Sequence, residues 1–124
     1  MAMTYTTQIV DEILVVQSEG QDGSLKEVED FNLSILSEAK KSGCKKVLSD
    51  ERQLTYNLSL AETFLLGEMV AKKLHFIQAV ALVVASNQEE IALFWENVTV
   101  NRHVHSRVFL DFDEAIKWLK SINT

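Results

Sequence analysis

The side chains with the most obvious chemical potential in this sequence are two histidines and a single cysteine. His103 and His105 are two residues apart, so on a strand both imidazoles would point to one side, as metal ligands can. Two ligands fall short of a metal site, and the nearest carboxylate, Asp111, would lie at the far end of the following strand. Cys44 has no histidine near it in the sequence to serve as its base. We therefore expect solvent-facing histidines, no metal site and no nucleophilic cysteine.

The acidic and glycine-containing segments also lack the companions that catalysis requires. Asp50 and Glu51 are adjacent, and adjacent strand residues point to opposite faces, so these two acids do not form an acid–base pair. The sequence has no G-x-S-x-G pattern for a serine hydrolase, and the glycines of "GQDGS" lack the spacing of a dinucleotide- or phosphate-binding loop. We expect no catalytic residue and no cofactor.

Ser59 has a structural role available to its hydroxyl. It lies in "LSDERQLTYNLSLAETFLL" (Leu48 to Leu66), three residues before Glu62. A small polar residue followed three positions later by Glu is the capping-box pattern at the start of a helix, and such a cap contributes about 1 kcal/mol. The same spacing recurs in Ser24 with Glu27, Ser86 with Glu89, and Asp111 with Glu114. The pattern predicts four helix starts and a capping role for Ser59.

The segments around these caps alternate between strand-like and helix-like hydrophobic periods. Strands are predicted at residues 4–10, 12–20, 44–50, 78–85 and 107–111. The first helix is predicted to end at Gly43, and the others to span residues 60–74, 88–97 and 112–123. The first two strands read as an antiparallel hairpin, and three strand–helix–strand crossovers require parallel pairing of the rest. We predict an α/β fold with a mixed five-stranded sheet and four helices on both of its faces, in the order ββαβαβαβα.

Composition limits the class of protein further. The chain has 124 residues, 47% of them hydrophobic, which predicts one domain spanning residues 1–124. A net charge of -6 opposes a nucleic-acid partner or an anionic membrane surface. The most apolar run, residues 76–86, is about half the ~20 residues that span a bilayer, so we expect no integral membrane association. The unpaired Cys44 and an N-terminus without signal-peptide features predict the cytoplasm.

The loops after the parallel strands gather polar residues at one edge of the predicted sheet. In open parallel sheets, ligands and partners meet the carboxyl ends of the strands, where helix N-termini present their amides. This edge would bring together residues 20–23, Asp50 to Arg52, Ser86, Asn87 and Asp111. Either they form a binding site or they are ordinary loop and capping residues.

The helix predicted at "IALFWENV" is apolar on more of its circumference than one sheet face needs. Some of Phe94, Trp95 and Val98 would then stay exposed and form a partner or homodimer surface. Burial under the hairpin or the following loop is the alternative, and both remain open.

With its elements in place, the chain resembles the STAS or SpoIIAA-like superfamily, the anti-sigma factor antagonist fold. It is most similar to a branch of small stand-alone bacterial proteins of unassigned function. Three segments carry the resemblance: "KKVLSDERQLTYNLSL", "AVALVVASNQEEIALFWENV" and the ending "SRVFLDFDEAIKWL". The resemblance covers nearly the whole chain from about Glu12 and implies a SpoIIAA-like fold and a regulatory role.

In antagonists of this superfamily, a serine of an Asp-Ser-Ser-Gly motif at the start of the second helix is phosphorylated, which blocks partner docking. The resemblance places Ser59 at that serine, Asp50 at the acid that ends the strand, and Leu54 and Tyr56 at the apolar positions between them. Leu58, Leu60 and Ala61 replace the motif's Asp, second Ser and Gly. The resemblance therefore implies a docking surface at Asp50, Arg52, Tyr56 and Ser59, while we expect Ser59 to be a cap and not a phosphosite.

Two functional hypotheses follow, and an enzyme ranks below both of them. The first is a non-enzymatic regulatory or protein-interaction domain that binds a protein partner at the strand-end edge and the exposed start of the second helix. This hypothesis also allows a homodimer through the surface at Phe94, Trp95 and Val98. The second is a small-ligand or lipid-binding module with a crevice between the second and third helices and the sheet. Its motivation is the apolar excess of "AETFLLGEMVAKKL" and "IALFWENV", and its ligand would be an apolar or anionic molecule near the helix starts.

Overall fold

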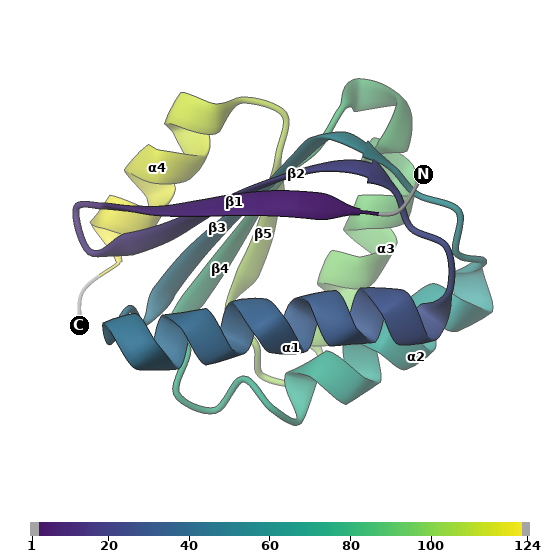
Figure 1. Cartoon of the computed structure of the whole chain (residues 1–124), viewed down its shortest axis with the longest axis horizontal. Helices are drawn as coiled ribbons and strands as arrows, with labels where there is room; N and C mark the ends of the chain where they lie inside the picture. Colours follow the sequence, from purple (N-terminus) through teal and green to yellow (C-terminus); the bar gives the residue numbers. More distant parts are fainter. Residues whose placement is uncertain (1–2, 123–124) are drawn as a thin grey trace.

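A computed structural model describes residues 3–122 and shows one five-stranded sheet with four helices (Figure 1). The elements in chain order are β1 (Thr4–Val10), β2 (Ile13–Gln21), α1 (Leu25–Ser42), β3 (Lys46–Thr55), α2 (Leu60–Ala71), β4 (Ala79–Val83), a 3-10 turn η1 (Ser86–Gln88), α3 (Glu89–Val100), β5 (Ser106–Phe109) and α4 (Phe112–Ser121). The strand order is β1-β2-β3-β4-β5, with β1 antiparallel to β2 and every other pair parallel. The predicted fold is confirmed.

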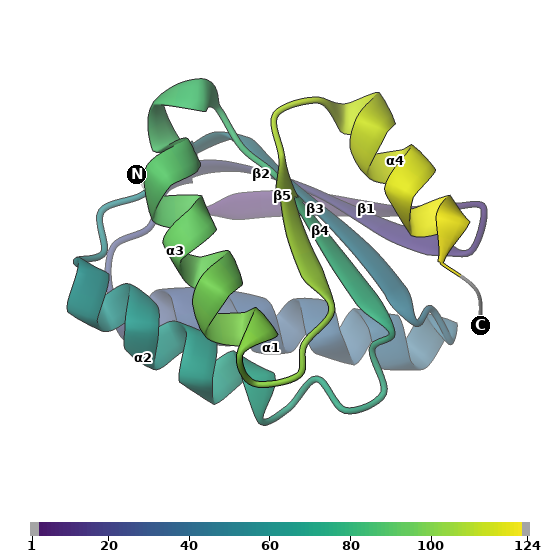
Figure 2. The same ribbon diagram turned by 180° about the vertical axis from the view of Figure 1, so that it is seen from behind.

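The helices form two layers around this sheet. Because the parallel strands follow one another in order and such crossovers are right-handed, the three crossover helices must lie on one face. Figures 1 and 2 show α1, α2 and α3 on that face and α4 across the sheet from them. Among the described residues, no helix is long and apolar enough to cross a membrane.

The core follows from covering the sheet on both sides. Residues 13–16 of β2 are all buried because alternate side chains meet helices on opposite faces. Ile13 and Val15 pack with Ala115 and Leu119 of α4. Leu14 and Val16 pack in a second cluster with Phe31, Ile35 and Ala39 of α1.

Three of the four predicted helix caps are confirmed. The side chains of Ser24, Ser59 and Asp111 each accept a hydrogen bond from the amide three residues later. The prediction for Ser86 is wrong, because Ser86 opens the turn η1 and α3 begins at Glu89. Neither η1 nor α3 has a side-chain cap.

The third strand is longer than its sequence predicts. It was expected to end at Asp50, but β3 continues to Thr55 by pairing with the end of β2. On the other edge of this extension, the side chain of Gln88 hydrogen-bonds the backbone. Its Nε2 donates to the Leu54 carbonyl at 2.7 Å, and its Oε1 accepts from the Tyr56 amide at 2.8 Å. The strand β4 pairs with β3 only as far as Val83. Beyond that point, the Gln88 side chain from η1 makes the hydrogen bonds that a neighbouring strand would otherwise make.

Helices α2 and α3 pack at close range, and this corrects one expected surface residue. An ideal Cβ on Gly67 would lie 2.6 Å from Cγ1 of Val98, so only glycine permits this approach. Val98 is therefore buried in the α2–α3 contact and cannot belong to an exposed surface. Phe94 and Trp95 are half-buried, and the exposed apolar residues of α3 are Leu93 and Val100. The predicted end of the last helix, Asn123, lies outside the described residues.

Candidate functional site

The residues predicted at the strand-end edge are divided by the sheet. On the α4 face, Nη2 and Nε of Arg52 donate to the two carboxylate oxygens of Asp50 at 2.8 and 2.9 Å. The Arg52 guanidinium also lies over the Phe112 ring, 5.8 Å from its centroid. The hydrogen bonds to Asp50 chiefly raise the pKa of Arg52, and the charges of Asp50, Asp111 and Asp113 add to the rise. Burial raises the pKa of Asp50, but the hydrogen bonds from Arg52 and Gln17 outweigh burial and lower it overall.

The opposite face holds an apolar cavity of about 120 Å³. It lies between the sheet and helices α1, α2 and α3, close to the crevice that the second hypothesis predicted. Its apolar lining includes Phe31, Ile35, Leu66, Val70, Leu82 and Trp95. Of the residues predicted for the docking surface, Asp50, Arg52, Tyr56 and Ser59, Tyr56 alone lines this cavity.

A buried carboxyl group forms the polar end of the cavity. Glu51 is 9% exposed; Oε2 accepts a hydrogen bond from the Ser49 hydroxyl at 2.8 Å, and Oε1 accepts one from the Tyr56 hydroxyl. Burial raises the pKa of Glu51, and the nearby charges of Asp22 and Asp50 add to that rise. Burial, followed by the charge of Glu51, raises the pKa of Tyr56 well above its ordinary value.

A second acid, Asp22, lies at the same polar end. It is 4% exposed and accepts a hydrogen bond from the Asn57 amide, while its own amide donates to the Thr55 carbonyl at 3.2 Å. Burial raises the pKa of Asp22, although the bond from Asn57 opposes the rise, and the charges of Glu27 and Glu62 add to it. Within residues 3–122, no Lys, Arg or His lines the cavity, so its polar end is acidic.

A bulge in β3 brings these side chains together. Gln17 pairs with Asp50 and Glu19 pairs with Gln53, so β3 has one residue more than β2 between the two pairs. One inserted residue reverses the alternation of side chains along the strand. Glu51 and Tyr56 are five positions apart, which would place them on opposite faces of a regular strand, yet both line the cavity.

Sequence reasoning placed residues 20–23 and Asp50 to Arg52 at one edge of the sheet but did not single out Asp22 and Glu51 among them. Glu51 was rejected as an acid–base partner of Asp50 because adjacent strand residues face opposite ways. That separation is confirmed, since Asp50 pairs with Arg52 on the α4 face. The segment "DERQL" contains neither glycine nor proline, so no local signal marks the bulge.

The remaining predicted residues lie on the surface. Ser86 and Asn87 are exposed in η1. Ser59 is exposed at the start of α2, where its Oγ accepts from the Glu62 amide at 3.1 Å and the Glu62 carboxylate accepts from the Ser59 amide at 3.0 Å. The predicted capping box at Ser59 is complete.

The Ser59→Ala variant is expected to lose about 1 kcal/mol of unfolding free energy, because the amide of Glu62 loses its acceptor. Ser86→Ala is the matched control, since Ser86 is an exposed serine that caps no helix, and it should change stability by less than about 0.5 kcal/mol. Urea unfolding of both variants measures the difference. Equal losses in the two variants would contradict a capping role for Ser59.

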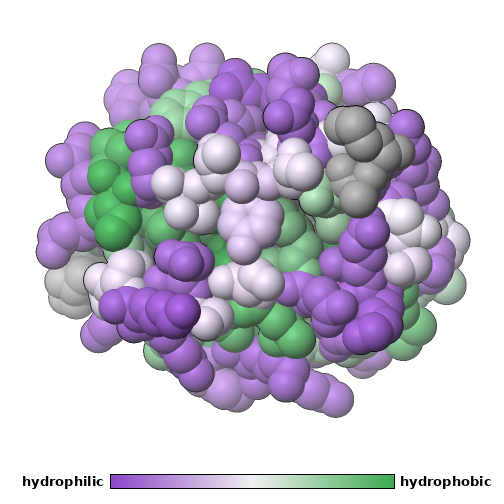
Figure 3. All heavy atoms as spheres, in the orientation of Figure 1, coloured by the Kyte–Doolittle hydropathy of each residue, from purple (hydrophilic) through white to green (hydrophobic). Residues whose placement is uncertain are grey.

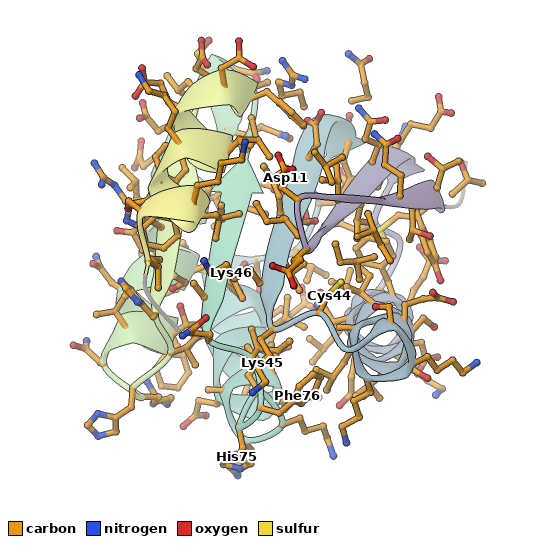
Figure 4. The ribbon with its side chains drawn as sticks, turned by 90° about the vertical axis from the view of Figure 1, so that its left-hand side faces the viewer. Asp11, Cys44, Lys45, Lys46, His75 and Phe76 are labelled. Atoms are coloured by element: carbon orange, nitrogen blue, oxygen red, sulfur yellow. The ribbon has the colours of Figure 1, made fainter. Side chains whose placement is uncertain are left out.

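The histidines and the cysteine lie apart from the cavity. His103 is exposed in a turn, and His105, also exposed, contacts Trp118 edge to face with ring centroids 5.0 Å apart. Figure 4 looks at the end where the parallel strands begin and shows Cys44 there, with His75 pointing away from it. Cys44 is buried. Among the described residues, no group of three or more potential ligands could hold a metal ion.

The outer face near β1 is largely hydrophilic. Figure 3 shows hydrophobic residues on this face only in patches, one at the hairpin end of β1 and one between β1 and α1. Tyr5 of β1 packs edge to face on Phe31 of α1, with ring centroids 5.3 Å apart. This contact lies next to the cavity wall, because Phe31 also lines the cavity.

No protein-family model matches the chain, and no curated protein matches its sequence. Solved structures do match its fold. An anti-sigma factor antagonist from Mycobacterium paratuberculosis has a TM-score of 0.68 at 11% identity, covering 97% of this chain and 96% of that one. The antagonist SpoIIAA in its unphosphorylated form has a TM-score of 0.60 at 14% identity, covering 98% and 100%. An uncharacterised protein of the DUF3478 family from Shewanella loihica, described as having a SpoIIAA-like fold, has a TM-score of 0.57 at 17% identity, covering 95% and 94%.

Proposed function

Since the chain has a SpoIIAA-like fold, we propose that it is a non-enzymatic regulatory module that binds an apolar small molecule in the cavity between α1, α2, α3 and the sheet. The observation that carries the proposal is the cavity itself, an apolar space with one polar end. Binding sites for small molecules commonly combine apolar walls with a few placed polar groups.

The size of the cavity sets the scale of its occupant. A dry protein cavity of about 150 Å³ accommodates benzene. The cavity of about 120 Å³ therefore suits a single ring or a short chain. A molecule of that size would add dispersion contacts with the lining side chains.

The departures from the superfamily's phosphorylation motif also support a ligand. Leu58, at the position of the motif's Asp, lines the cavity. Thr63, Leu66 and Val70 of α2 line it as well. The segment that serves as a phosphorylation switch in antagonists of this fold is thus part of the cavity wall in this chain.

A protein partner is the second candidate function, favoured by the outer side of α2. Leu60, Phe64 and Leu65 are exposed by 59%, 38% and 45%. The two similar antagonists act, as their names state, on anti-sigma factors. Helix α2 would then face a partner on its outer side and the ligand on its inner side, so the occupant of the cavity can influence docking. A homodimer through α3, a cytoplasmic location and a single domain at residues 1–124 remain predictions within this proposal.

Native mass spectrometry of protein purified from its own host tests the ligand. We expect a reproducible bound mass that denaturation releases. Val70→Phe should abolish this mass by filling the cavity, whereas Val100→Phe, the same change at an exposed position of α3, should retain it. Absence of a bound mass, or its persistence in Val70→Phe, would overturn the proposal, and a bound protein instead would favour the second candidate.

A further inference from the structure

We propose that the ligand of the cavity is an apolar amine whose ammonium group lies against the carboxylates of Glu51 and Asp22. This inference rests on the proposed function and names the chemical class of the ligand. The cavity is the site, and the acids at its polar end decide which head group it accepts.

Neither acid has a cationic partner among the described residues. The ion pairs within residues 3–122 use other acids: Lys26 with Asp30, Arg52 with Asp50, Arg102 with Glu68, and Lys120 with Asp11. Glu51 is held by two hydroxyl groups and Asp22 by a backbone amide, so all three hydrogen bonds come from neutral donors.

Burying two neighbouring acids without a cation lowers the stability of the folded protein. Burial disfavours the charged form of each carboxyl, and each carboxylate repels the other. Burial accordingly raises the pKa of both groups, and the charge of Asp22 adds to the rise at Glu51. An ammonium group placed between them would offset both effects, because a buried carboxylate is stabilised chiefly by a paired cation.

The other features of the cavity match the same head group. Phe31, Tyr56 and Trp95 line it, and aromatic rings attract ammonium groups as well as apolar bodies. The charges of Glu27 and Glu62, which act on Asp22, make the surroundings more negative and would favour the approach of a cation.

An anionic ligand, which the sequence had left open, does not fit this site. Its appeal was the starts of the second and third helices, α2 and α3, whose amides can bind anions. At the start of α2 the Glu62 amide already donates to Ser59, and the first turn of α3 carries Glu89 and Glu90, whose charges would repel an anion. A carboxylate ligand would therefore add a third negative charge beside Glu51 and Asp22.

Three probes of one shape test the head group: benzylamine, benzyl alcohol and benzoate. Isothermal titration at pH 7.5 should give an affinity for benzylamine about tenfold or more above that for benzyl alcohol, and no binding of benzoate. Glu51→Gln and Asp22→Asn should each weaken benzylamine about tenfold and leave benzyl alcohol within about twofold. Glu19→Gln and Asp30→Asn remove an exposed acid and should leave all three affinities unchanged.

The outcomes separate this inference from the proposed function. Equal affinity for benzyl alcohol and benzylamine, or preferred binding of benzoate, would overturn the amine and leave a ligand-binding cavity. Equal weakening of benzylamine by the exposed-acid controls would also overturn it, because the effect would then come from net charge. If none of the probes binds and the native protein carries no bound mass, both proposals fail. Thermal unfolding of every variant confirms that it is folded before titration.

Discussion

The Glu51→Gln variant is expected to be more stable than the parent protein at pH 7, by roughly 1–3 kcal/mol, the usual penalty for a buried polar group that is poorly compensated. Glutamine has nearly the same shape as glutamate. Its carbonyl oxygen can accept the hydrogen bond from Ser49, and its amide can donate to the hydroxyl oxygen of Tyr56. The substitution therefore removes a buried acid, keeps the hydrogen bond from Ser49 and reverses the direction of the one with Tyr56.

The pH dependence of this effect has a definite sign. Burial raises the pKa of Glu51 in the folded protein above its unfolded value, so the folded state binds the proton more tightly. The parent protein is consequently most favoured below the unfolded pKa of about 4.3 and loses stability as the pH rises towards the folded pKa. The advantage of Glu51→Gln should be small at pH 4, grow through this window and then level off.

Urea unfolding of the parent and of Glu51→Gln between pH 4 and pH 8 measures this advantage. Glu19→Gln is the control, because Glu19 is exposed and its replacement should give no pH-dependent gain. A variant less stable than the parent at pH 7, or a gain independent of pH, would count against a destabilising carboxyl at position 51. A gain in stability combined with loss of amine binding would mark Glu51 as a residue that serves function at a cost in stability.

The Arg52→Ala variant is expected to lose roughly 2–3 kcal/mol at pH 7, because it leaves the carboxylate of Asp50 without its cation. The Asp50 side chain is 7% exposed and that of Arg52 is 42% exposed. The loss should therefore fall between the ~0–1 kcal/mol of an exposed pair and the ~3–5 kcal/mol of a broken buried pair. The backbone amide of Arg52 and the side chain of Gln17 still donate to Asp50, which limits the loss.

The sign of the pH effect is opposite to that at Glu51. The hydrogen bonds from Arg52 lower the pKa of Asp50, so the pair stabilises the fold above the unfolded pKa of about 3.9. This contribution is lost as the pH falls through the lowered folded pKa. The difference between the parent and Arg52→Ala should therefore be largest near pH 7 and shrink in acid.

Two further variants make the prediction specific. Lys26→Ala breaks a pair whose side chains are 82% and 58% exposed, and it should cost less than about 0.5 kcal/mol. Adding Asp50→Asn to Arg52→Ala should recover most of the loss, because position 50 then carries no buried charge. A loss at Arg52 equal to that at Lys26, or no recovery in the double variant, would contradict the assignment.

The order of the elements could be predicted because its causes are local. Capping at Ser24, Ser59 and Asp111 depends on residues three positions apart, and the apolar run of β4 reflects burial on both faces. The same rule failed at Ser86 because a distant interaction prevailed. Gln88 is used to hydrogen-bond the end of β3, so the chain makes a 3-10 turn before α3 begins.

The surface of α3 and the composition of the cavity required the tertiary structure. Apolar excess in "IALFWENV" indicated that some residues would be exposed, but only the close approach of Gly67 shows that Val98 is buried while Leu93 and Val100 are exposed. Similarly, Tyr56 was selected for its position after β3, and nothing in the sequence showed that its side chain would face the same cavity as those of Asp22 and Glu51.

The sequence by itself determined the five strands, the four helices, the parallel crossovers and the acidic character of this protein, because hydrophobic period, capping and charge are properties of short segments. Only the tertiary structure decided which acids are buried together. A single bulge between Asp50 and Gln53 reverses the facing of every later side chain in β3 and turns Tyr56 towards Glu51. The pairing of β3 with β2 fixes that bulge, so the chemistry of the cavity depends on a strand register that no local pattern records.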